Sequence, residues 1–78
     1  MERKEVVEKV NEVLLEQMCL DNAPKETDSL TDDLGFDSLD AVELIMELES
    51  KFSVKIADED VPDMKTVSDV VELVIKHQ

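Results

Sequence analysis

The chain has very few aromatic residues, a single cysteine and a single histidine. Its 78 residues include no tryptophan or tyrosine, and the only phenylalanines are Phe36 and Phe52. Cys19 has no second cysteine with which to form a disulfide in the chain. Together with His77 it does not provide the four-ligand spacing of a zinc site. These shortages exclude a disulfide scaffold and a zinc module, and the core is expected to be aliphatic.

Basic residues are also scarce. Eight lysines and arginines stand against 21 aspartates and glutamates, so the formal net charge is −13. This charge repels nucleic acid and anionic membranes, and it favours basic protein surfaces as partners. No stretch has the length and apolarity of a membrane span or the pattern of a secretory signal. We therefore expect a cytoplasmic monomer with no membrane span and no nucleic-acid ligand.

The length predicts one domain, residues 1–78. An apolar content of 42%, mostly valine and leucine, is enough for one thin core and distinguishes the chain from an acidic disordered tail. A domain of this size has no room for an interior cleft walled by a second domain. We expect a protein that is not an enzyme.

Helical periodicity dominates the hydrophobic pattern. Apolar residues form one broad stripe over residues 2–16, which predicts an amphipathic helix. Further helices are predicted from residue 38 to about 51 and from 67 to about 76, the last with Thr66 as its N-cap. Residues 57–60 have the composition of one short helical turn. The predicted fold is all-α, a small four-helix bundle of three principal helices and one short helix.

A long loop separates the first two predicted helices. It runs from about Gln17 to Phe36, and its turn-forming residues, among them Pro24 and Gly35, argue against a continuous helix. A loop of this length in so small a domain is usually packed or functional. The apolar residues expected to hold it against the core are Leu20, Leu30 and Leu34.

A serine lies on the first turn of the predicted second helix. Asp37 before it can cap the helix, and Asp40 three residues later can complete a capping box. Backbone amides and the helix dipole make the position of Ser38 favourable for an anion such as a phosphate ester. A hydrolytic role is excluded, because the only histidine, His77, is far away in the sequence and no nucleophile-elbow spacing surrounds the serine.

The predicted second helix carries two apolar faces. One face is expected to join the core and consists of Ala41, Leu44, Ile45, Leu48 and Phe52. The nearly opposite face consists of Leu39, Val42 and Met46. A thin bundle cannot bury both faces, and carboxylates flank the second one, so we interpret it as a docking strip for a basic partner. The alternative is a set of scattered exposed apolar side chains without a function.

Clustered carboxylates do not form a specific metal site in the sequence. Counting from Asp28 or Asp33 does not place oxygen ligands and glycine at the positions of an EF-hand loop. Weak binding of divalent cations would only relieve repulsion among the acids. We predict no specific metal ligand.

Residues 33–44 resemble the prosthetic-group attachment region of acyl carrier proteins. The segment reads Asp33-Leu34-Gly35-Phe36-Asp37-Ser38-Leu39-Asp40-Ala41-Val42-Glu43-Leu44. In that family a phosphopantetheinyl transferase moves 4′-phosphopantetheine from coenzyme A to the serine, which here is Ser38, and the terminal thiol carries acyl chains. The resemblance also implies that enzymes of fatty acid synthesis dock through basic patches. The partner-binding residues implied are Asp37, Leu39, Asp40, Val42, Glu43, Met46 and Glu49.

Details of the segment favour one branch of the family. Asp-Ser-Leu-Asp followed by Val-Glu-Leu resembles the discrete carriers of fatty acid synthesis more than peptidyl or D-alanyl carriers. Phe36 stands where the family commonly has alanine, which predicts an altered rim beside Ser38. Two alternatives remain open at this point: a carrier for a specialised polyketide or other acyl pathway, and an acidic helical adaptor without a prosthetic group.

Overall fold

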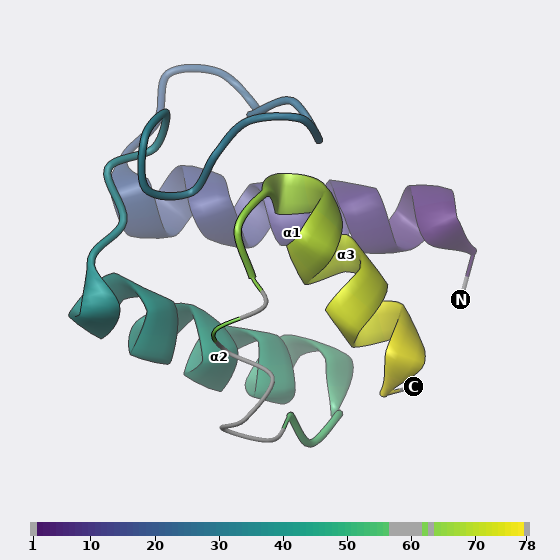
Figure 1. Ribbon diagram of the computed structural model, residues 1–78. Coiled ribbons are helices and arrows are strands. Elements are labelled where there is room, and N and C mark those ends of the chain that lie inside the picture. The colour runs from purple at the N-terminus through teal and green to yellow at the C-terminus, as the bar shows by residue number, and fades with distance from the viewer. Residues whose placement is uncertain (1, 57–61, 63, 78) are drawn as a thin grey trace.

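Three helices form the regular structure of the part of the chain that the computed structural model describes, which is residues 2–56, 62 and 64–77. They are α1 (Arg3–Met18), α2 (Ser38–Phe52) and α3 (Val67–Lys76). In Figure 1, α1 and α2 run in opposite directions and α3 crosses them at an angle. The all-α fold with three principal helices and a long loop after the first is confirmed. The predicted short turn at residues 57–60 lies outside the described residues.

Helix starts agree with the sequence better than helix ends do. Asp37 and Thr66 cap α2 and α3, and each forms the reciprocal capping box expected of it. The predicted end of the first helix, residue 16, is two residues short, because α1 continues to Met18. Cys19 then closes the helix with a left-handed backbone, φ 53°, a conformation that usually calls for glycine. No glycine therefore marks this helix end in the sequence.

The core is almost entirely aliphatic. Phe36 is the one aromatic residue buried in it among the described residues. Phe52 and Ala41, both predicted for the core face of α2, are only partly buried. The buried apolar side chains are Val6, Val10, Val13, Leu14, Leu30, Phe36, Leu44, Ile45, Leu48, Ile56, Val67, Val70, Val71, Leu73 and Val74.

The long loop is fixed to the amino end of α3. The amide of Leu30 donates a hydrogen bond to the carbonyl of Lys65 (2.9 Å), and the amide of Val67 donates to the carbonyl of Asp28 (3.1 Å). Leu30 is buried, and Leu20 and Leu34 pack partly buried against the core. All three leucines thus hold the loop as predicted, and the loop leads into α2 from a fixed position (Figure 1).

Asp69 closes the capping box of α3. Its carboxylate accepts hydrogen bonds from the amides of Lys65 and Thr66, both at 3.0 Å, and its own amide donates to the Thr66 hydroxyl at 3.2 Å. The hydrogen bond from Lys65 is the largest of the effects that hold the pKa of Asp69 below its ordinary value of 3.8. The ionised carboxylate is therefore favoured in the folded state.

Asp69→Ala is expected to lower the free energy of unfolding by about 1 kcal/mol at neutral pH, the usual loss for a helix cap. Because the folded pKa lies below the unfolded one, this carboxylate stabilises the fold fully above 3.8 and loses its effect as pH falls through the lower folded pKa. Thermal melts at about pH 7 and about pH 3 should show a difference between wild type and variant that shrinks at the lower pH. Asp21→Ala, at an exposed loop position, is the control. A difference of equal size at both pH values would contradict the prediction.

Candidate functional site

Ser38 is the first residue of α2 and is exposed. Asp37 and Asp40 cap the helix around it: the Asp40 amide donates to the Asp37 carboxylate (3.0 Å), and the Asp37 amide donates to the Asp40 carboxylate (3.1 Å). Among the hydrogen bonds of the described residues, none uses the Ser38 hydroxyl or the amides of Ser38 and Leu39. The hydroxyl is therefore available for chemistry, and two first-turn donors beside it can face an anion.

The loop turns sharply just before the serine. Gly35 has φ +76°, a backbone conformation that side chains disfavour, and Phe36 follows with its amide donating to the carbonyl of Leu30 (2.8 Å). The Phe36 side chain is only 6% exposed and belongs to the core. The Phe36 ring therefore forms no part of the exposed surface beside Ser38, and its effect on the rim remains a prediction. Burial of the ring is favourable because it removes a large apolar surface from water.

Gln17 ties the end of α1 to the start of α2. Its side-chain amide donates a hydrogen bond of 2.7 Å to the backbone carbonyl of Asp40. This contact places α1 beside the first turn that carries Ser38. The sequence analysis did not identify Gln17, because no local pattern marks a glutamine that bonds to another helix.

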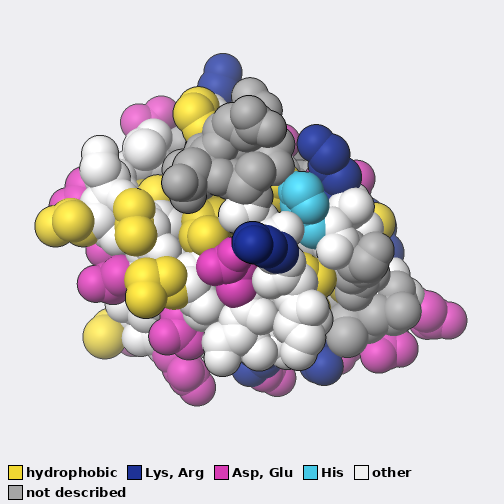
Figure 2. Space-filling model, turned by 90° about the horizontal axis from the view of Figure 1, so that it is seen from below, with side chains coloured by type: hydrophobic (Ala, Val, Ile, Leu, Met, Phe, Trp, Pro, Cys, Tyr) yellow, Lys and Arg dark blue, Asp and Glu magenta, His cyan; other side chains and the backbone are white. Residues whose placement is uncertain are grey.

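The strip predicted for docking is exposed. Leu39 is 74%, Val42 54% and Met46 62% exposed, which makes them the large apolar side chains most open to solvent in the described part of the chain. Figure 2, seen from below relative to Figure 1, shows hydrophobic side chains gathered at one side of the molecule with acidic ones among them. The exposure of this face is confirmed, and its role in docking remains a prediction.

The acidic residues predicted to bind partners lie in different surroundings. Asp37 and Glu43 are exposed, and Asp40 is partly buried in the capping box. Glu49 is also partly buried, and its carboxylate accepts a hydrogen bond from the Ile56 amide at 3.1 Å. Glu49 thus holds the segment that follows α2, whereas the Glu43 carboxylate accepts no hydrogen bond from the described residues.

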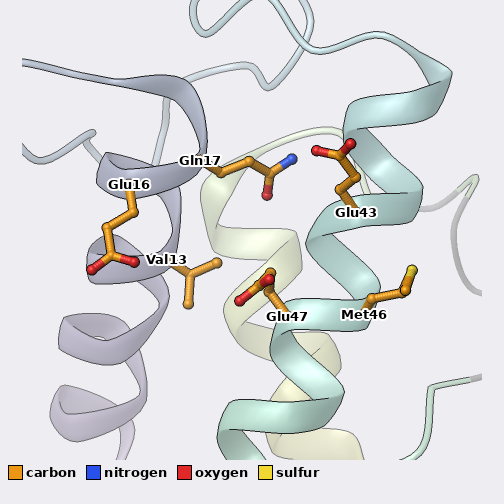
Figure 3. A pocket seen from close by; sticks show the side chains of 6 residues that line it. All are labelled: Val13, Glu16, Gln17, Glu43, Met46 and Glu47. Carbon is orange, nitrogen blue, oxygen red and sulfur yellow. The ribbon is translucent and has the colours of Figure 1, made fainter.

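A groove of about 350 Å³ lies between α1 and α2 close to this site. Figure 3 shows its lining, to which each helix contributes three residues. They are Val13, Glu16 and Gln17 of α1 and Glu43, Met46 and Glu47 of α2. The groove begins at the Gln17 contact and reaches the edge of the exposed strip at Met46.

Within residues 2–56, 62 and 64–77, no three histidine, cysteine, aspartate or glutamate side chains lie close enough together to hold a metal ion. Over the same residues, none of the helices combines the length and apolarity needed to cross a bilayer. Cys19 is a free, exposed thiol at the end of α1.

Comparison with known proteins gives matches over almost the whole chain. A family model described as the phosphopantetheine attachment site matches residues 8–74. The acyl carrier protein of Rubrobacter xylanophilus is 39% identical over 79 residues, covering 100% of this chain and 98% of its own length. That of Solidesulfovibrio magneticus is 43% identical over 72 residues, covering 91% and 92%.

Solved structures show the same likeness. The crystal structure of an acyl carrier protein from Thermotoga maritima matches with a TM-score of 0.82 and 35% identity, covering 99% of this chain and 91% of its own. The acyl carrier protein from Enterococcus faecalis matches with a TM-score of 0.79 and 32% identity, with complete coverage of both chains. The similarity therefore extends to both sequence and fold.

Proposed function

Because this chain belongs to the acyl carrier protein family, we propose that its 4′-phosphopantetheine is attached at the hydroxyl of Ser38. A protein of this family is a non-catalytic carrier, and the chain matches the family's phosphopantetheine attachment site. The observation that carries the assignment to Ser38 is its exposed, uncommitted hydroxyl at the start of α2. When bound, the group supplies a thiol that holds acyl chains as thioesters.

The first turn of α2 suits a phosphodiester. The amides of Ser38 and Leu39 and the positive end of the helix dipole favour a negative charge there. Asp37 and Asp40 oppose it by like-charge repulsion, but each carboxylate already accepts a hydrogen bond from a backbone amide of the other residue. The residues present therefore fit the attached group.

The proposal extends to the pathway: the acyl chains are those of fatty acid synthesis. Support comes from the segment around Ser38, which resembles the discrete carriers of that pathway, and from the exposed strip beside it. In this function the strip and Glu43 contact each enzyme in turn, and the acids speed the encounter with basic surfaces. Contacts of small area suit a carrier that must release each partner.

Leu39→Ala combined with Met46→Ala is expected to lower kcat/KM of a fatty-acid condensing enzyme for the loaded carrier by about tenfold, because a few side chains at the centre of an interface supply most of its binding energy. The free energy of unfolding should change by less than about 0.5 kcal/mol, since both side chains are exposed. The measurement is chain elongation by purified fatty acid synthesis enzymes, followed by mass spectrometry.

The control for this pair is Glu5→Ala, an exposed residue on α1 away from the strip. It should leave elongation within about twofold of wild type. Failure of the loaded wild-type carrier to be elongated by these enzymes would favour a specialised acyl pathway. Unchanged elongation by the double variant would remove the docking role of the strip.

A further inference from the structure

One arginine joins the first turn of α1 to both the long loop and α3. Nη1 of Arg3 donates to the Glu26 carboxylate of the loop (2.6 Å), and Nη2 donates to the Glu72 carboxylate of α3 (3.0 Å). We propose that this ionic clamp controls how readily the loop detaches from α3, that salt weakens it, and that it thereby fixes the backbone before Ser38. The clamp belongs to the unmodified chain and does not depend on what the serine carries.

Backbone hydrogen bonds hold the loop on the start of α3 beside the clamp. The Ser68 amide donates to the carbonyl of Glu26 at 2.9 Å, next to the hydrogen bonds that Val67 and Leu30 make between the same two segments. These three hydrogen bonds are the loop–α3 contact. Glu26 is therefore held twice, by its carbonyl on α3 and by its carboxylate on Arg3.

The guanidinium keeps together two carboxylates that repel each other. Both lie within hydrogen-bond distance of one planar group, in a chain whose net charge is −13. The hydrogen bonds to Glu26 and then to Glu72 raise the pKa of Arg3, so its charge is permanent. Removal of this charge replaces an attraction across the loop–α3 contact with a repulsion between Glu26 and Glu72.

The loop–α3 contact leads directly to the candidate site. The carbonyl of Leu30 accepts a hydrogen bond from the Phe36 amide (2.8 Å), two residues before Ser38. Leu30 is only 2% exposed, so detachment of the loop brings an apolar core side chain into water, which is unfavourable. The clamp adds to this cost from the solvent side. Arg3 is thus a positioning residue for the start of α2.

Dissolved ions have access to the clamp. The side chains of Arg3, Glu26 and Glu72 are 43%, 43% and 62% exposed, and salt screens ion pairs that are open to solvent. The same screening relieves repulsion among the 21 acidic residues and stabilises the domain as a whole. We therefore expect salt to affect the loop–α3 contact and the whole fold in opposite directions.

Amide hydrogen exchange, followed by nuclear magnetic resonance under native conditions, measures the opening of the contact. Arg3→Gln is expected to raise the exchange rates of the Ser68 and Phe36 amides about fivefold, because two exposed ion pairs are lost. The matched control is Lys51→Gln, which removes the same charge from the ion pair with Glu12 between α1 and α2. It should leave the exchange of both amides unchanged.

A second measurement raises the salt concentration from about 0.01 M to about 1 M at constant pH. In the wild type, the Ser68 amide should exchange faster as salt rises, while the melting temperature increases. In Arg3→Gln the same amide should exchange more slowly, because salt then screens the repulsion between Glu26 and Glu72. Addition of Glu72→Gln to this variant should remove most of the response to salt.

Equal exchange of the Ser68 amide in wild type and Arg3→Gln, or the same response to salt in both, would overturn the clamp. Unchanged exchange of the Phe36 amide in Arg3→Gln would overturn its effect on the segment before Ser38. Both measurements use the unmodified full chain. A failure of Ser38 to accept a prosthetic group would therefore leave their outcome unaffected.

Discussion

Ser38→Ala is expected to abolish the attachment of phosphopantetheine completely. The variant has no hydroxyl at this position to form the phosphodiester, and residues 33–44 contain no other serine. The fold should be unaffected, because Asp37 and Asp40, not Ser38, make the capping hydrogen bonds. Intact mass after incubation with coenzyme A and a transferase should show one added group on wild type and none on the variant.

Ser50→Ala is the matched control, since Ser50 is an exposed serine on the same helix. It should be modified as wild type is. Modification of the Ser38 variant would assign the attachment to another residue. A wild-type protein that is never modified, yet binds a basic partner through the exposed strip, would instead support the acidic adaptor.

Phe36→Ala is expected to lower the free energy of unfolding by about 3 to 4 kcal/mol, the usual cost of deleting a buried ring. The side chain is 6% exposed and is the one aromatic member of a core otherwise made of aliphatic residues in the described part of the chain. A domain of this length has little stability to lose, so much of the population should unfold near physiological temperature. Denaturant titration followed by circular dichroism would measure the change.

Phe52→Ala serves as the comparison, because Phe52 is only partly buried and lies at the end of α2. The Lys9 Nζ atom lies 6.0 Å from the centroid of its ring. Phe52→Ala should lower the free energy of unfolding by less than half as much as Phe36→Ala does. Phe36→Leu should recover most of the lost stability, since it refills the apolar site with a similar volume. A cost below about 1 kcal/mol for Phe36→Ala would mean that the core collapses around the gap.

Local signals made the helix starts predictable. The capping pairs Asp37 with Asp40 and Thr66 with Asp69 lie within four residues of sequence, and the structure forms both. The end of α1 was not predictable in this way, because Cys19 adopts a left-handed conformation without the glycine that usually signals it. The end of a helix depends more on the conformation and packing of the residues that follow it than on the residues within it.

The features of the candidate site also differ in whether local sequence could predict them. Helical periodicity identified the exposed strip, since it depends on the spacing of residues within one helix. The burial of Phe36, the hydrogen bond from Gln17 to α2 and the attachment of Glu49 to Ile56 depend on how separate segments meet. The spacing of residues in the sequence carries no information on contacts between separate segments. These contacts could be found only from the structure.

The position of Ser38 depends on a segment made later in synthesis. Phe36 hydrogen-bonds to Leu30, and Leu30 hydrogen-bonds to Lys65, just before α3. A ribosome releases the residues around Ser38 before Lys65, so the loop lacks this anchor until Lys65 has emerged. The platform for the serine is therefore completed only when the segment leading into α3 has emerged, and a transferase that requires the folded platform can act only from that point on.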